Sequence, residues 1–292
     1  MTVAFHNDPR SFLKEAGDFL KQHQIEHNLM LSLCQHADAK CARGDATGFR
    51  GCVVKGEEGI VLAAVQTPPH NLVLSRSAGA NMAEVVQTLT QNGWQFSGIV
   101  GPSDVTNAFS TQWAQLTGEQ PSEFMDQIIY DLKKVVFPPP VEGTFRLAEP
   151  AEAKVAAVWL EAFAKDAHLP KGEQPDETAA LKKAEELIAA RRLAVWDVKG
   201  KPVAQAGVFG TEDVARIGAV YTPPEARGHG YASAVVAYLS QQQLEQGKKI
   251  CCLYADARNP VSNSIYRKIG YEFAARSSMY MLATSVSARQ TG

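Results

Sequence analysis

The pattern of apolar and polar positions divides the second half of the chain into short strands and amphipathic helices. Apolar strands are predicted over 144–147, 193–198, 203–211, 214–221 and 250–255. Helices are predicted over 151–166, 176–191 and 231–246 and from Val261 onward, with a closing hairpin through Phe273 and Leu282. This alternation is typical of an α/β (α+β) domain, in which a mixed central sheet is flanked by helices.

The first half of the chain shows the same alternation less regularly. Helices are predicted over 9–23, 27–37, 82–92 and 105–117, and strands over 51–55, 59–66, 72–75, 98–100 and 126–136. A short echo joins the two halves, because residues 64–69 read AVQTPP and residues 219–224 read AVYTPP. We therefore expect two related halves in tandem.

A proline run separates these halves. Residues 137–140 read FPPP, and such a run continues neither a helix interior nor a sheet ladder. The length of 292 residues also suits two domains. The predicted domains are therefore 1–140 and 141–292.

Composition and charge are ordinary for a soluble globular protein. Hydrophobic residues make up 45% and charged residues 21%, with a formal net charge of -2, so neither nucleic acid nor an anionic membrane is an expected partner. No apolar window is long enough for a membrane span, and residues 1–10 contain Asp8 and no apolar core of a signal peptide. We expect a cytoplasmic protein. Its five cysteines include no C-x-x-C pair and are expected to be reduced thiols.

The segment 220–233 carries the strongest chemical signal. An apolar strand ends at two prolines, and Gly228 and Gly230 then precede a long helix. Unpaired main-chain N–H groups at a helix start, together with the positive end of the helix dipole, attract a phosphate. Glycine lets a pyrophosphate approach the main chain closely. The sequence therefore predicts a phosphorylated cofactor.

Two common phosphate motifs do not fit this segment. A dinucleotide fingerprint would need glycine or alanine in place of Ser233 and an acidic residue roughly 20 positions later. A nucleoside triphosphate loop would need a lysine where the chain has His229, Gly230 and Tyr231. What remains is Arg-x-x-Gly-x-Ala, from Arg227 to Ala232. It resembles the acyl-CoA pyrophosphate loop of the GCN5-related N-acetyltransferases, the GNAT family.

A second block strengthens this resemblance. After the strand at 250–255, residues 259–271 read NPVSNSIYRKIGY, which is similar to the last conserved segment of the family and to its FR47-like branch of predicted acetyltransferases. The resemblance covers roughly residues 145–282. It implies a GNAT fold, with two GNAT-like halves in tandem of which the first is degenerate and holds no cofactor.

The resemblance also implies acetyl-CoA as the cofactor and a set of site residues. The pyrophosphate would be held by Arg227, Gly228, His229, Gly230, Tyr231, Ala232 and Ser233. The main chain of Val220, Tyr221 and Thr222 would pair with the pantetheine arm, which Asn259 and Ser262 would also contact. Tyr266 would approach the sulfur as the catalytic proton donor to the departing thiolate.

The implied reaction is transfer of an acetyl group to a primary amine of a small molecule or peptide by direct attack, which depends mainly on positioning and on polarising the thioester. For the general base, Glu161, Asp166 and His168 are candidates, although each has the character of a surface residue. The loops that would shape the acceptor pocket, 165–175 and the tip near Arg276, carry no specificity pattern. Since no base stands out, a non-catalytic acyl-CoA-binding or regulatory module is the alternative.

One competing motif is His23-x-x-Glu26-His27. On a continuous helix it would place two imidazoles one turn apart for zinc, with the glutamate as base. No third ligand is identifiable, and both histidines continue an apolar stripe from Phe19 toward Met30. We therefore expect histidines of a core or helix junction and no metal site.

Overall fold

The computed structural model describes residues 1–170 and 174–282. The chain forms two compact units: among the described residues, the first holds Met1–Gln127 and 275–282, and the second is Ile128–Ala274. The predicted domains, 1–140 and 141–292, were defined by the repeated pattern of the sequence, whereas these units are defined by compactness. The two domains therefore stay a prediction. Residues 283–292 of the second predicted domain lie outside the described residues.

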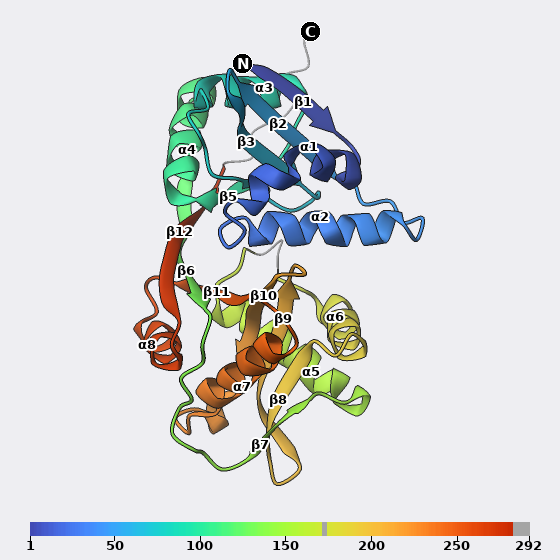
Figure 1. The fold of residues 1–292 in the computed structure, drawn as a ribbon, viewed down its shortest axis with the longest axis vertical. Coiled ribbons are helices and arrows are strands. Elements are labelled where there is room, and N and C mark those ends of the chain that lie inside the picture. The colour runs from blue at the N-terminus through green and yellow to red at the C-terminus, as the bar shows by residue number, and fades with distance from the viewer. Residues whose placement is uncertain (171–173, 283–292) are drawn as a thin grey trace. The chain divides into compact units, whose positions relative to one another are not determined.

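The first unit is a mixed sheet with two helices on each face (Figure 1). Its strands follow the order β1-β2-β3-β4-β5-β12-β6, and only β4 and β5 pair in parallel among the strand pairs described for this unit. The strands are β1 (Thr2–His6), β2 (Arg50–Gly56), β3 (Gly59–Gln66), β4 (Leu72–Leu74), β5 (Gly98–Pro102) and parts of β6 (Ser122–Leu132) and β12 (Glu272–Met281). The helices are α1 (Pro9–Lys21), α2 (Asn28–Cys41), α3 (Met82–Gln91) and α4 (Ser103–Thr117).

The second unit has the same layered construction. Its strands follow the order β12-β6-β11-β10-β9-β8-β7, with β7 (Thr144–Leu147), β8 (Leu193–Val198), β9 (Lys201–Gly210), β10 (Val214–Tyr221) and β11 (Ile250–Asp256). Its helices are η1 (Pro150–Glu152), α5 (Ala153–Asp166), α6 (Glu177–Ala189), η3 (Pro224–Ala226), α7 (Tyr231–Glu245) and α8 (Pro260–Ile269). Helices α7 and α8 pack on one face of the sheet, and α5 and α6 pack on the other.

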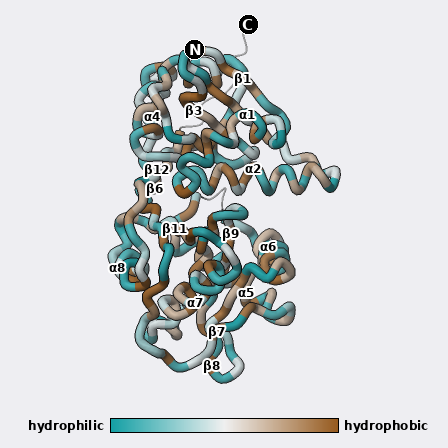
Figure 2. Tube along the Cα trace, in the orientation of Figure 1, coloured by the Kyte–Doolittle hydropathy of each residue, from teal (hydrophilic) through white to brown (hydrophobic). Residues whose placement is uncertain are grey.

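Hydropathy follows these layers. The central strands carry long apolar runs, whereas polar and apolar residues alternate along the helices (Figure 2). Apolar burial of this kind is the main favourable contribution to folding. Among the described helices, none is both long and apolar enough to cross a bilayer.

The proline segment between β6 and β7 is held down by aromatic packing. The ring of Tyr238 on α7 lies 5.0 Å from that of Phe137 and 6.0 Å from that of Phe145, measured between centroids. The indole of Trp196 packs 5.5 Å from the same tyrosine and donates a hydrogen bond of 2.8 Å to the carbonyl of Glu142. These contacts fix the segment against α7.

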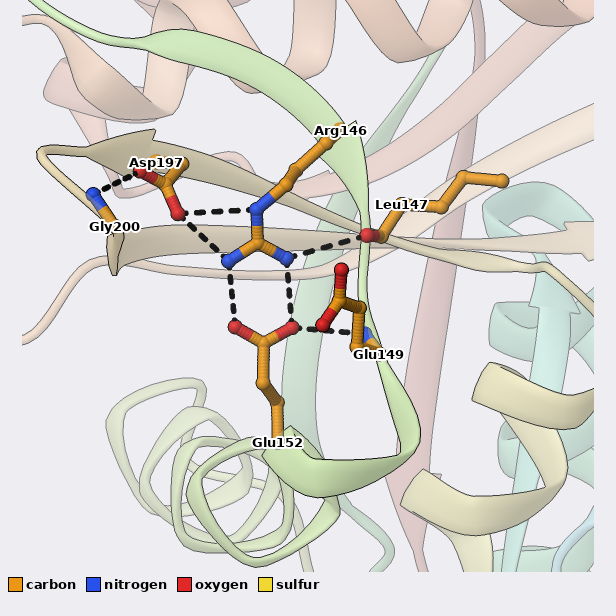
Figure 3. Close-up of polar contacts among 6 residues, drawn as sticks. All are labelled: Arg146, Leu147, Glu149, Glu152, Asp197 and Gly200. Atoms are coloured by element: carbon orange, nitrogen blue, oxygen red, sulfur yellow. Dashed lines mark hydrogen bonds and ion pairs between the residues drawn. The ribbon is translucent and has the colours of Figure 1, made fainter.

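Edge strand β7 is tied to its neighbours by an arginine that binds two carboxylates (Figure 3). Arg146 donates to both carboxylate oxygens of Glu152, at 2.8 and 2.7 Å, and donates twice to Oδ2 of Asp197 on β8. Glu152 also accepts the N–H of Glu149 at the start of η1. Hydrogen bonding from Arg146 lowers the pKa of Glu152 below its ordinary value. The cluster thus joins β7, β8 and the start of α5.

The secondary structure differs from the sequence prediction in two places. The predicted closing hairpin is wrong, because Glu272–Met281 is one continuous strand. The segment EFAARSSMYM contains no glycine, proline or asparagine to form a tight turn. Conversely, β1 was not expected. It is a short edge strand whose five residues lack the buried apolar run that marks a central strand.

The His-x-x-Glu-His motif does not lie on a continuous helix. Helix α1 ends at Lys21 and α2 begins at Asn28, so the motif falls in the turn between them. Nδ1 of the buried His27 lies 2.9 Å from the carbonyl of Leu20, and its Nε2 accepts the N–H of Arg76 at 2.9 Å. Burial lowers the pKa of His27, which favours its neutral form. The two ring nitrogens of His27 therefore connect this turn to α1 and to the segment after β4.

Candidate functional site

The site predicted from the sequence is built where β10 and β11 separate. These strands pair in parallel only from Val214↔Ile250 to Arg216↔Cys252. Beyond that point β10 continues to Tyr221 and β11 to Asp256, with no further pair between them. Beyond this point the two strands are not paired with each other. An extended ligand that pairs with their main chains requires such an opening.

A β-bulge marks the same part of β10. Gly218 pairs with Gly207 and Tyr221 pairs with Gln205, so Ala219 and Val220 face a single residue of β9. Ala219 has a φ of 51°, an uncommon value for a residue with a Cβ atom. It packs against α5 and α6, whereas Val220 packs on the α7 side. The bulge thus redirects the end of β10 beside the opening.

The loop after β10 presents a row of unpaired main-chain N–H groups. The N–H of Arg227 bonds to the carbonyl of Pro224, and the first N–H of α7 with a helical partner is that of Ala234, bonded to Gly230. From Gly228 to Ser233, no N–H group donates to an acceptor within residues 1–170 and 174–282. Helix α7 also has no side-chain cap and no acidic residue in its first turn. This end of α7 is suited to an anion.

Two glycines give this loop its path. Gly228 has a φ of +82° and Gly230 a φ of +81°, in the left-handed region that other residues rarely adopt. A Cβ atom on Gly228 would meet nothing within 4 Å, whereas one on Gly230 would lie 3.1 Å from Val141. His229 stacks on Tyr231, with ring centroids 5.4 Å apart. The approach to the N–H groups is therefore open at position 228.

The side chain of Arg227 braces the loop. Its Nε donates to the carbonyl of Thr222 at 3.0 Å, and its Nη2 donates to Asp166 at the end of α5 at 2.7 Å. The guanidinium also lies 5.8 Å from the ring centre of Tyr221. One arginine thus connects the end of β10, the loop and α5.

Helix α8 is capped at its N-terminus by Asn259, one of the residues expected at the pantetheine. Its Oδ1 accepts the N–H of Ser262 at 3.1 Å, and Oγ of Ser262 donates to the carbonyl of Asn259. The neighbouring Asn263 is buried and donates to the carbonyls of Asp256 and Asn259. The expected contact residues therefore cap α8, and Asn263 ties that helix to the end of β11.

Tyr266 lies one helical turn after Ser262, within a cluster of three tyrosines. Its ring packs 6.4 Å from that of Tyr130 and 6.1 Å from that of Tyr271. Tyr130 donates to Asn263, and the hydroxyl of Tyr271 bonds to Ser240. The hydroxyl of Tyr266 has no hydrogen-bond partner in the described part of the chain, so it is the available one of the three. Burial raises the pKa of Tyr266 to about 12.

Comparisons with known proteins concern the fold and one segment of the chain. Residues 198–281 match the family model described as FR47-like protein. Similar solved structures include an acetyltransferase of the GNAT family from Colwellia psychrerythraea, with 14% identity, a TM-score of 0.57, and coverage of 97% of this chain and 99% of that one. Residues 198–281 are thus similar to the FR47-like family, and the chain has a GNAT fold. The predicted family and fold class are thereby confirmed.

Two further structures support the GNAT fold over nearly the whole chain. A GCN5-related N-acetyltransferase from Sphaerobacter thermophilus has 15% identity and a TM-score of 0.62, and covers 95% of this chain and 94% of that one. A tandem GNAT protein from the clavulanic acid biosynthesis pathway has 13% identity and a TM-score of 0.53, with 96% and 98% covered. A search of curated proteins finds no match.

The candidate bases Glu161, Asp166 and His168 lie on α5 or directly after its end. Asp166 is paired with Arg227. His168 is close enough to Asp256 for its charge to act on that carboxylate. Glu161 is half-buried on α5. The predicted acceptor loop 165–175 includes residues 171–173, which lie outside the described residues. The carboxylate of Asp256, at the end of β11, is paired with Arg258.

Proposed function

We propose that this protein is an acetyl-CoA-dependent N-acetyltransferase that acts on a primary amine of a small molecule or peptide. The observation that carries the proposal is the row of unpaired N–H groups from Gly228 to Ser233, which follows directly on the opening between β10 and β11. Main-chain N–H groups at a helix start fit a diphosphate. Strands that separate leave main-chain groups for an extended pantetheine arm.

Bound acetyl-CoA would supply a thioester with a carbonyl carbon open to attack. In the overall reaction a nitrogen–carbon bond forms, the carbon–sulfur bond breaks, and the proton lost by the amine is balanced by the proton gained by the thiolate. The loop from Gly228 to Ser233 would bind the diphosphate, and Val220, Tyr221 and Thr222 would orient the pantetheine through their main chain. Asn259 and Ser262, at the start of α8, border the same site. Holding the two reactants in attack geometry contributes most of the rate enhancement in this scheme.

Tyr266 would stabilise the departing sulfur. A thiol has a pKa of roughly 8.5, so full proton transfer from a phenol whose pKa is raised to about 12 is uphill by about 5 kcal/mol. A hydrogen bond from the hydroxyl to the developing thiolate needs no such transfer, and charge-assisted bonds of this kind are strong. We therefore assign Tyr266 the role of hydrogen-bond donor to sulfur, with the proton balance completed by solvent.

A non-catalytic acyl-CoA-binding module is the second candidate, favoured by the pairing of Asp166 with Arg227, which leaves that carboxylate engaged. Calorimetric titration with acetyl-CoA and a thiol-release assay over a panel of primary amines separate the two functions. Binding together with turnover supports the enzyme. Binding without turnover of any amine supports the module, and absence of binding refutes both.

A further inference from the structure

Arg216 is a charged side chain on the α5 and α6 face of the second unit. It pairs with Phe209 of β9 on one side and with Cys252 of β11 on the other. Its neighbours along β10, Ala215 and Ile217, both belong to the core under α7. Since successive side chains of a strand point to opposite faces, Arg216 points to the other face.

Two aromatic rings hold the guanidinium of Arg216. Its carbon lies 5.6 Å from the ring centre of Phe209 and 5.8 Å from that of Tyr254, within the range of cation–π interactions. These contacts fix the plane of the group but satisfy none of its N–H donors. The rings therefore position the guanidinium without accepting hydrogen bonds from it.

Arg216 has no acidic partner within residues 1–170 and 174–282. Its Nε is buried and has no hydrogen-bond acceptor, and no salt bridge includes it. Arg146, Arg227 and Arg276, by contrast, each bind a carboxylate. A buried donor left without an acceptor costs free energy, which a ligand that supplies the acceptor would recover.

The position of Arg216 relates this donor to the proposed site. The pair Arg216↔Cys252 is the last one before β10 and β11 separate. The next residue on the same face, Gly218, has no side chain, and the bulge at Ala219 follows it. The opening between β10 and β11 closes at this pair, so the guanidinium borders its closed end. The acetyl group would enter the opening from its other end, near Gly228.

The charges nearby favour a ligand with a single negative charge. The positive charge of Arg216 and the negative charge of Asp131 both act on the buried thiol of Cys252. Asp131, on β6, makes no salt bridge with Arg216. Nζ of Lys183 on α6 also lies 5.6 Å from the ring centre of Phe209, so two cations and one anion are close together here. One carboxylate would balance these charges, and it matches the planar fork of the guanidinium.

We propose that Arg216 binds a carboxylate of the acceptor, so that the amines acetylated by this protein also carry a carboxylate group, as amino acids do. This inference rests on the proposed N-acetyltransferase function and names its substrate class. Arg216 is then a specificity-determining residue, and Phe209 and Tyr254 are positioning residues that hold its plane.

The test uses the full chain, acetyl-CoA and matched pairs of acceptors, each amino acid beside its carboxamide. The variants are Arg216→Gln and, as a control, Arg192→Gln, which changes the exposed arginine immediately before β8. For the wild type and the control we expect kcat/KM for the acids to exceed that for the amides by about 10- to 100-fold. In Arg216→Gln this ratio should fall to near one, while kcat/KM for the amides and the Kd of acetyl-CoA stay unchanged.

An equal loss for acids and amides in Arg216→Gln would overturn the inference and leave Arg216 a structural residue. The same follows if the wild type does not prefer the acids. If acetyl-CoA binds and no amine is acetylated, the proposed function fails separately. The inference is then decided by calorimetric titration of the CoA-bound protein with each acid and its amide: preference for the acid, lost in Arg216→Gln, supports it, and equal or absent binding refutes it.

Discussion

A single negative charge at Gly228 tests the phosphate loop most directly. Gly228 is exposed, has a φ of +82°, and a Cβ atom there would meet no atom within 4 Å. Aspartate and asparagine both tolerate this left-handed conformation and have nearly the same shape. The pair Gly228→Asp and Gly228→Asn therefore carries the same backbone strain, and the two variants differ only in charge.

The size of the effect follows from Coulomb's law. At a separation of about 6 Å, one pair of unit charges contributes about 0.7 kcal/mol in water and about 3 kcal/mol at an effective dielectric constant of 20. The exposure of the loop favours the lower part of this range, and a diphosphate carries about two charges. A total of about 1.5 to 3 kcal/mol would raise the Kd of Gly228→Asp about 10- to 100-fold over that of Gly228→Asn.

Calorimetric titration with coenzyme A measures this difference. Repeating the titration in 1 M salt, where the Debye length is about 3 Å, should remove most of it. Thermal unfolding without ligand provides the control, because both variants should unfold at the same temperature. Equal affinities for the two variants at low salt, or a difference that salt leaves unchanged, would refute the assignment of the loop to the diphosphate.

Three further predictions concern the rest of the second unit. Tyr266→Phe should lower kcat about 10-fold or more with little change in the Kd of acetyl-CoA, and a collapse of binding with turnover per complex intact would contradict the role of its hydroxyl. Arg146→Met should lower the free energy of unfolding at pH 7 by about 2 kcal/mol, measured by urea denaturation, because the buried carboxylate of Asp197 and the half-buried one of Glu152 lose their partner. Since the pKa of Glu152 is lowered from 4.5, this stabilisation is complete above that pH and is lost as pH falls through the lowered value. The difference in the free energy of unfolding between the variant and the wild type should therefore narrow as the pH falls below 4.5. Asn263→Ser should detach α8 from Asp256 and reduce kcat more than acetyl-CoA affinity, and unchanged kinetics would show that this anchor does not position Tyr266.

The helix boundaries near the site could be predicted because single residues set them. Gly247 follows the end of α7, Asn259 caps α8, and Gly270 ends α8 with a φ of +102°. Their conformational preferences are local, so the letters alone indicate the structure. The same holds for the loop after β10, where two glycines in sequence give it its left-handed turns.

Contacts that join distant segments could not be predicted in this way. Arg227 and Asp166 are separated by 61 positions, and nothing in either neighbourhood pairs them. No motif in the sequence marks Arg216 as a functional residue. Its place between Phe209 and Tyr254 depends on the register of three strands, which is a property of the folded sheet.

The C-terminal strand β12 has a consequence for biosynthesis. Residues from Ala275 onward belong to the first unit, where β12 lies between β5 and β6. During translation the ribosome delivers β5 and β6 long before β12, so both nascent strands keep open edges until synthesis of the chain reaches residue 281. Open edges invite pairing with other chains, and we expect polypeptides released before that point to aggregate.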